Sequence, residues 1–127
     1  MKKEILATSI IVGSALLTSC IKQKSQTDVD IPVTLTLQDS IGDGWDGGQT
    51  MTLINQDSGE SFGPYTCVDE NECVINVTLT GPAQYQVNVT DGAFSNEISW
   101  IISGQSGVLI SAYAPNAAPY SGTFNLT

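Results

Sequence analysis

Residues 33–53 read Val-Thr-Leu-Thr-Leu-Gln-Asp-Ser-Ile-Gly-Asp-Gly-Trp-Asp-Gly-Gly-Gln-Thr-Met-Thr-Leu, and this stretch decides the fold class. Apolar and polar side chains alternate over residues 33–38 and again over residues 50–53. Alternation with a period of two is typical of a β-strand that buries one face. The residues between, 39–48, include three aspartates, four glycines and one tryptophan. The stretch therefore predicts two strands joined by an acidic, glycine-rich loop.

The rest of the chain repeats this pattern of strands and turns. No window after residue 20 has a helical period, and turn-forming residues separate the apolar runs. The sequence predicts an all-β fold: a single small antiparallel β-sandwich, jelly-roll-like, with seven or eight strands. A nearly continuous apolar run predicts a central strand at residues 108–113, and a weaker run predicts a short edge strand at 61–66. The remaining strands are predicted at residues 75–80, 85–90, 98–103 and 124–126.

The first 20 residues have the features of an export signal. A positive start precedes an apolar segment, Ile5–Leu17, which is too short and wrongly flanked for a membrane-spanning helix. The segment leads into Leu17-Thr-Ser-Cys20, which resembles the bacterial lipobox. The resemblance implies that residues 1–19 are a lipoprotein signal peptide and that acyl chains on Cys20 anchor the protein to a membrane. The alternative is an ordinary signal peptide followed by a chance cysteine.

The predicted mature chain begins with a linker. Residues 20–30 are polar and lack periodicity, so we expect the lipidated Cys20 and a flexible tether there, with the β-sandwich domain over residues 31–127. By resemblance to known sorting signals, Ile21 rather than aspartate after the cysteine favours the outer membrane in a cell that has one. The sequence thus predicts a lipid-anchored protein of the bacterial cell envelope, periplasmic or surface-exposed.

The charge of the chain excludes one class of partner. The 127 residues include 13 acidic and 4 basic side chains, and histidine is absent. All four basic residues are lysines, and the predicted cleavage leaves Lys22 and Lys24 against 12 acids, a formal charge of −10. Nucleic acids and phosphates are therefore not expected as partners. The alternative is that the acidic residues only keep the protein soluble, but here many of them are grouped in loops.

The two cysteines of the predicted domain are expected to pair. Cys67 and Cys73 are separated by five residues, three of them acidic, in a chain predicted to be exported. Disulfides persist in exported proteins. A zinc site is the alternative, but the sequence offers no histidine and no second cysteine pair to complete one. We predict a Cys67–Cys73 disulfide that holds the acidic side chains of its loop near one another.

The acidic loop has the composition of a calcium site. Calcium takes six to eight oxygen ligands, so a site needs converging carboxylates and glycines that let carbonyl groups turn inward. Asp39, Asp43 and Asp46 supply carboxylates whose mutual repulsion a divalent cation would relieve. The spacing is not that of an EF-hand, which requires an oxygen ligand where Ile41 stands and a glutamate where Thr50 stands. The alternative is a tight turn whose aspartates simply face water.

A further ligand has to come from another part of the chain. Glu97 precedes the predicted strand at residues 98–103, whose alternate side chains face the core. Its own side chain is therefore expected on the other face, at a strand end where loops gather. Asp91 and Asn96, in the same loop, are secondary candidates. The predicted ligands of a Ca2+ ion are Asp39, Asp43, Asp46 and Glu97.

Two motifs in the chain resemble those of a known domain type. Asp39-Ser-Ile-Gly-Asp-Gly-Trp-Asp-Gly47 is followed about 50 residues later by Glu97-Ile-Ser-Trp100. The pair is similar to a small β-domain found in many secreted and surface proteins of bacteria and some microbial eukaryotes. The resemblance covers nearly all of residues 31–127. It implies the β architecture, export, and the pairing of the acidic loop with Glu97, and it implies no activity.

Trp45 and the lack of catalytic groups separate the functional alternatives. Trp45 is expected either to fold back over the edge of the core or to stay exposed and contact a sugar or a partner's side chain. No histidine is available for a Ser-His-Asp set, no thiol remains free, and a metal accounts for the carboxylates Asp43 and Glu97, so we do not expect an enzyme. The sequence predicts a surface binding or adhesion module with a calcium-stabilised loop and a glycan or protein ligand. The alternative is a structural or accessory lipoprotein of an envelope complex, without a metal.

Overall fold

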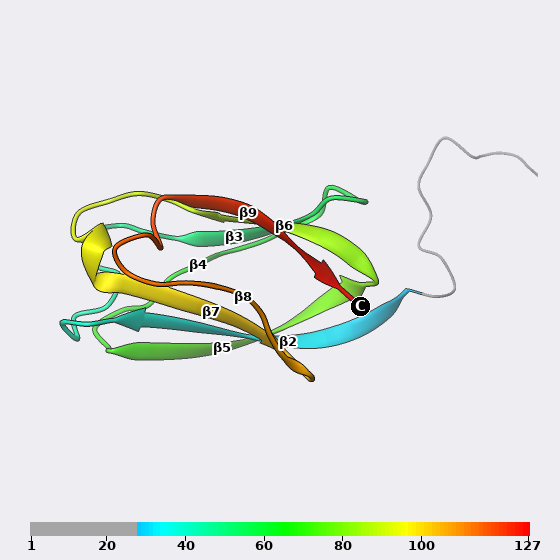
Figure 1. The fold of residues 1–127 in the computed structure, drawn as a ribbon, viewed down its shortest axis with the longest axis horizontal. Coiled ribbons are helices and arrows are strands. Elements are labelled where there is room, and N and C mark those ends of the chain that lie inside the picture. Colours follow the sequence, from blue (N-terminus) through cyan, green and yellow to red (C-terminus); the bar gives the residue numbers. More distant parts are fainter. Residues whose placement is uncertain (1–27) are drawn as a thin grey trace, which may run out of the picture.

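The chain folds as a sandwich of two antiparallel sheets (Figure 1). The computed structural model describes residues 28–127. Its elements are β2 (Val29–Asp39), β3 (Met51–Asn55), β4 (Ser61–Tyr65), β5 (Glu72–Gly81), β6 (Ala83–Val89), the 3-10 turn η2 (Ser95–Glu97), β7 (Ile98–Gly104), β8 (Gly107–Ala112) and β9 (Tyr120–Leu126). One four-stranded sheet has the order β5-β2-β7-β8, and the other has the order β4-β3-β6-β9. The predicted all-β sandwich is confirmed.

The connections explain how the loops come to lie at the two ends. Within the described residues, only β3–β4 and β7–β8 are neighbours both in the chain and in a sheet, and every other connection crosses between the sheets. This repeated crossing is the jelly-roll-like feature of the fold. β2 begins at Val29, ahead of the predicted domain start at Ile31, because Val29 and Asp30 pair with Gly81 and Thr80 of β5. The predicted signal peptide, Cys20 and most of the predicted tether lie outside the described residues.

Alternating side chains from the two sheets form one core. On β2, Val33, Leu35 and Leu37 are buried while the threonines between them are only partly covered. Tyr85 of the facing sheet and Trp100 of β7 are also fully buried. Full burial of a large apolar side chain contributes roughly 1.5–3 kcal/mol, so the period-two pattern fixes the face that each strand turns inward.

One strand prediction is wrong in its place in the sheet. The apolar run at residues 108–113 was expected to form a central strand, but β8 is at the edge of its sheet and Val108 is 62% exposed. Tyr113 lies beyond the end of β8 and is exposed as well. A continuous apolar run fits a strand buried on both faces, but run length does not report whether a further strand pairs with it. The predicted edge strand near Ser61 is confirmed as β4.

The predicted disulfide is confirmed. Cys67 and Cys73 are bonded, with their Cα atoms 5.5 Å apart. The bond closes the loop between β4 and β5 over residues 67–73 and places Cys67 in the core. The loop therefore starts and ends at anchored positions.

Replacing both cysteines with serine is expected to lower the free energy of unfolding by about 2–2.5 kcal/mol. The reason is that opening the ring over residues 67–73 restores chain entropy to the unfolded state. Urea unfolding followed by tryptophan fluorescence measures the change, with the wild-type protein under reducing conditions as a second comparison. An unchanged unfolding midpoint would show that the bond contributes nothing to stability.

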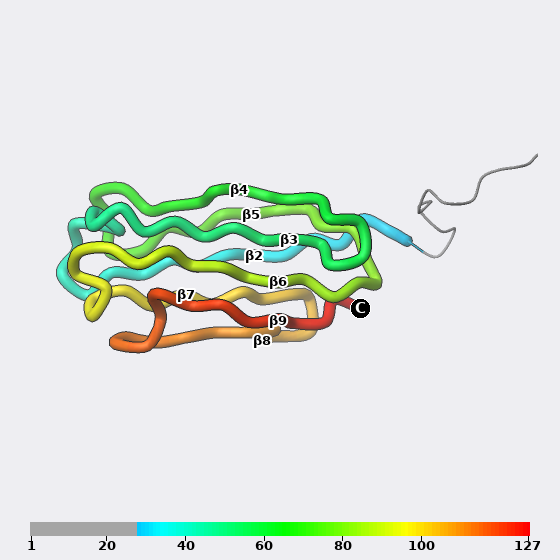
Figure 2. Tube along the Cα trace, turned by 90° about the horizontal axis from the view of Figure 1, so that it is seen from above, coloured from blue at the N-terminus to red at the C-terminus, as the bar shows by residue number. Residues whose placement is uncertain are grey.

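Three loops gather at one end of the sandwich. Figures 1 and 2 show the connections at residues 40–50 and 90–97 at the end opposite the first described residue and the C-terminus. The cysteine loop joins them there, because its backbone bonds to the 40–50 segment. We call this the loop end. Among residues 28–127, no helix is long and apolar enough to cross a membrane.

Candidate metal centre

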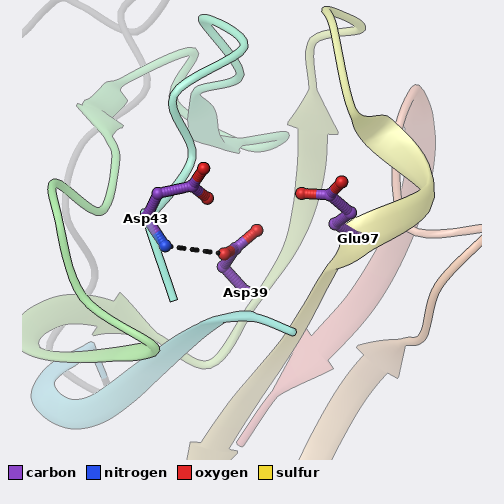
Figure 3. A group of neighbouring side chains, drawn as sticks. All are labelled: Asp39, Asp43 and Glu97. Atoms are coloured by element: carbon purple, nitrogen blue, oxygen red, sulfur yellow. Dashed lines mark hydrogen bonds between the residues drawn. The ribbon is translucent and has the colours of Figure 1, made fainter. Parts of the chain in front are cut away.

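Three carboxylates converge at the loop end (Figure 3). Oxygen atoms of Asp39, Asp43 and Glu97 all lie within 4.8 Å of one another. Asp39 is the last residue of β2, and Glu97 ends η2 immediately before β7. These two strands pair antiparallel with Asp39 opposite Ile98. Sheet register therefore places Asp39 beside Glu97, and the loop brings Asp43 back over them.

The Asp39 carboxylate is held on one side and unpaired on the other. Its Oδ2 accepts N–H bonds from Ile41 at 3.2 Å, Gly42 at 2.6 Å and Asp43 at 3.0 Å. The residue is 3% exposed, and its Oδ1 has no hydrogen-bond partner among residues 28–127. In Figure 3 that second oxygen points toward the space between Asp43 and Glu97. A buried charged oxygen without a partner is costly, so this atom is suited to accept a cation, a proton or a bound water.

Backbone hydrogen bonds fix the three segments that carry the site. The N–H of Ser40 donates to the carbonyl of Glu97 at 2.9 Å, which ties the acidic loop to η2. The N–H of Asp39 donates to the carbonyl of Asn71 at 2.8 Å, and the N–H of Trp45 donates to that of Cys67 at 2.7 Å. The acidic loop is thus attached to the disulfide loop on one side and to the start of β7 on the other. Contacts within the protein therefore hold the segments that carry the carboxylates.

Trp45 belongs to the core, and this corrects one expectation. Its side chain is 3% exposed, and its indole N–H donates to the carbonyl of Gln38 at 3.1 Å. The alternative in which Trp45 folds back over the core edge therefore holds, and the indole is not exposed as the other alternative, a contact with a ligand, expected. The physical reason is that burying an indole and satisfying its N–H outweighs leaving it in a solvent-facing loop.

The crowding of negative charge shows in the pKa values of the cluster. Desolvation, the adjacent carboxylate of Asp39 and the charge of Asp46 raise the pKa of Asp43 from 3.8 to about 6. Desolvation, Asp39 and Asp46 also raise the pKa of Glu97. Like charges at this distance disfavour full ionisation, and a bound cation would reverse the effect.

Not every predicted ligand joins the cluster. Asp46 is exposed and lies outside the group of three, yet its charge is close enough to raise the pKa of Asp43 and Glu97. Asp91 accepts bonds from the Ser95 hydroxyl at 2.7 Å and from the Gly92 N–H at 2.9 Å, which lower its pKa. The structure therefore brings together three of the four predicted ligands and gives Asp91 a role in shaping its own loop.

Sequence reasoning missed Gln49. This side chain is 1% exposed, and its Nε2 donates to the carbonyl of Ala93 at 2.8 Å and to the Ser95 hydroxyl at 2.9 Å. It holds the segment that leads into Glu97 against the acidic loop. A single glutamine after two glycines carries no signal of burial, because its position is set by a contact with residues more than forty positions away.

The donor set defines what the site can hold. All three groups are carboxylates, and the domain has no histidine and no unpaired cysteine. Oxygen-only sites suit hard cations such as calcium and magnesium rather than zinc or copper.

Comparison with protein-family models, curated proteins and solved structures finds no match to this chain.

Proposed function

We propose that this protein is a lipid-anchored binding module of the bacterial cell envelope whose loop end is completed by a calcium ion. The observation that carries the proposal is the Oδ1 atom of Asp39, which is buried, unpartnered among residues 28–127 and directed between Asp43 and Glu97. Three backbone N–H groups hold the other oxygen of Asp39, so the carboxylate cannot turn away. A cation between the three groups would satisfy the buried oxygen and neutralise the repulsion.

Calcium is favoured over magnesium by the shape of the site. Magnesium demands near-ideal octahedral geometry and keeps several waters, whereas calcium accepts irregular sets of carboxylate oxygens. Here the donors come from a strand end, a glycine-rich loop and a 3-10 turn. Calcium modules outside cells bind at about 10⁻⁴–10⁻³ M, which matches a site with one buried and two more exposed carboxylates.

The fold also supports the binding of a ligand on the side of the protein that faces away from the membrane. The start of β2 and the C-terminus lie at the end of the sandwich opposite the loop end (Figure 1). A lipid on Cys20 would attach the protein through residues just before Asp28. The loop end would then point away from the membrane, toward a ligand.

Calcium is expected to raise the melting temperature of the purified protein. With a dissociation constant of 10⁻⁴–10⁻³ M, about 10 mM calcium stabilises the folded state by roughly 1.4–2.7 kcal/mol. For a domain of this size the melting temperature rises by roughly 6–20 °C. Scanning calorimetry in calcium and in a chelator measures the shift, and equal melting temperatures would overturn the proposal.

Two variants separate a specific site from general charge screening. Asp39→Asn keeps the shape of the side chain but removes the charge and places an amide where calcium would bind, so it should abolish the shift. Asp57→Asn removes the same charge from the turn between β3 and β4 and should leave the shift intact. Equal responses of the two variants would contradict binding at the cluster.

Lowering the pH is expected to stabilise the ion-free protein and weaken its response to calcium. The folded-state pKa of Asp43, about 6, exceeds its ordinary value of 3.8, so between these values the folded state binds more protons than the unfolded state. The free energy of unfolding in chelator attributable to Asp43 therefore rises as the pH falls from 7 toward 4. Calcium needs the deprotonated carboxylate, so its effect shrinks over the same range.

Melting curves at pH 7 and pH 5 test both trends, each with calcium and with chelator. The lowered pKa of Asp91 acts in the opposite direction, so the comparison that isolates Asp43 is wild type against Asp43→Asn. The variant should have a weaker gain in chelator on acidification. Identical pH dependence in the two proteins would show that Asp43 is not held in an unfavourable charged state.

A further inference from the structure

The three carboxylates do not fill the coordination shell of a calcium ion. Asp39 offers one oxygen, because its Oδ2 is occupied by three N–H donors. Asp43 and Glu97 offer at most two oxygens each, so the cluster supplies at most five of the six to eight that calcium takes. Asp43 is exposed, so the cluster opens to solvent on that side. Oxygens from outside these side chains can therefore reach the ion from solution.

We propose that these open positions bind two adjacent hydroxyl groups of a neutral sugar, an inference that rests on the calcium site proposed above. A vicinal pair of hydroxyls supplies two oxygens at a spacing that one calcium ion accepts. The ligand class is thus a neutral polysaccharide or glycan presented to the loop end, recognised through the ion rather than through hydrogen bonds alone.

The negative charge of the domain disfavours anionic ligands of the calcium ion. Residues 28–127 contain 12 acidic side chains and no lysine, arginine or histidine. One calcium ion among three carboxylates leaves a net negative charge, and Asp46 adds to it. A carboxylate or phosphate ligand would be repelled, and an ammonium group has no lone pair to give to the ion. Among uncharged oxygen donors, which also include water and amide carbonyls, a vicinal hydroxyl pair has the advantage that one small ligand places two oxygens on the same ion.

An exposed aromatic residue lies three positions before Glu97 in the chain. Phe94 is 55% exposed and immediately precedes the turn that ends at Glu97, with the N–H of Glu97 donating to its carbonyl at 3.0 Å. Its backbone has φ 63°, a left-handed conformation that is unusual for a bulky residue and that tends to persist at functional sites. Ile41, two residues after Asp39, is also exposed. Because both residues are close in the chain to cluster residues, we expect their apolar side chains to contact the C–H face of a sugar ring.

The test uses the intact protein and separates ion binding from sugar binding. Calcium binding is first measured by calorimetric titration. The calcium-loaded protein is then passed over immobilised neutral polysaccharides (mannan, galactan and dextran), over polygalacturonate as an anionic polymer, and over a poly-glutamate peptide. A second set of the neutral polymers is treated with periodate and then reduced, which destroys vicinal hydroxyl pairs and leaves the polymer uncharged.

We expect retention on at least one neutral polymer, released by chelator and lost after periodate treatment. Phe94→Ala should weaken retention roughly fivefold to tenfold while leaving the calcium titration unchanged, since Phe94 is not a predicted ligand. Asp57→Asn should behave as wild type. Calcium titration without retention on any neutral polymer, retention that survives chelator or periodate, or preference for polygalacturonate or poly-glutamate would overturn this inference and leave the calcium site standing. Absence of a calcium titration would overturn both.

Discussion

Trp45→Ala is expected to lower the free energy of unfolding by about 3–5 kcal/mol, a large part of the 5–15 kcal/mol typical of a domain. The indole of Trp45 is 3% exposed, so its removal leaves a cavity and deprives the Gln38 carbonyl of its hydrogen-bond donor. The loop that carries Asp43 should lose its anchor, and the calcium-dependent rise in melting temperature should fall with it. Urea unfolding followed by circular dichroism measures the first effect, and calorimetry measures the second.

Phe94→Ala is the matched control for Trp45→Ala. Both residues are aromatic and lie at the loop end, but Phe94 is exposed, so its truncation should change stability by less than about 0.5 kcal/mol. A Trp45→Ala protein that is as stable as wild type would contradict the core assignment. It would restore the view that Trp45 is kept for contact with a ligand.

Gly47→Ala is expected to have the second largest effect, at the upper end of the 1–3 kcal/mol that overpacking costs, together with at least roughly a tenfold loss of calcium affinity. A Cβ atom built at Gly47 would lie 1.7 Å from the carbonyl oxygen of Ala93, which is backbone and cannot rotate away. The acidic loop and the segment leading to Glu97 would have to separate. Calcium titration and urea unfolding of the variant measure the two losses.

Gly48→Ala is the control for the close approach at Gly47. Gly48 has φ 91°, so alanine there is strained by about 1–2 kcal/mol, but nothing lies within 4 Å of the added Cβ. It should lower stability while keeping most of the calcium affinity. If the two variants lost calcium affinity equally, the contact between Gly47 and Ala93 would not be what holds the two halves of the site together.

The sequence predicts the strands well because their physical basis is local. Alternation along β2, with Val33, Leu35 and Leu37 inward, reports directly which face is buried. The same rule cannot report the order of strands, because order depends on which distant strand supplies hydrogen bonds. This is why the apolar run of β8 was expected in the centre of a sheet and is found at its edge.

The site is predictable only in part for a related reason. Composition indicates that carboxylates gather in residues 39–48, and strand ends indicate that Glu97 lies near them. Which loop aspartates turn inward depends on backbone dihedrals at several glycines, and spacing does not encode these. Asp46 therefore stays outside the cluster. Gln49, whose burial the sequence does not indicate, donates a hydrogen bond to the carbonyl of Ala93 in the neighbouring loop.

The most direct test of a cation held by Asp39, Asp43 and Glu97 is a crystal structure of the protein grown with calcium at pH 7.5, with an anomalous difference map. A calcium ion bound there would give a peak about 2.3–2.6 Å from Oδ1 of Asp39 and from carboxylate oxygens of Asp43 and Glu97. A map without that peak, showing instead Oδ1 of Asp39 within hydrogen-bond distance of an Asp43 oxygen, would contradict it, because a shared proton and not a metal would then satisfy the buried carboxylate.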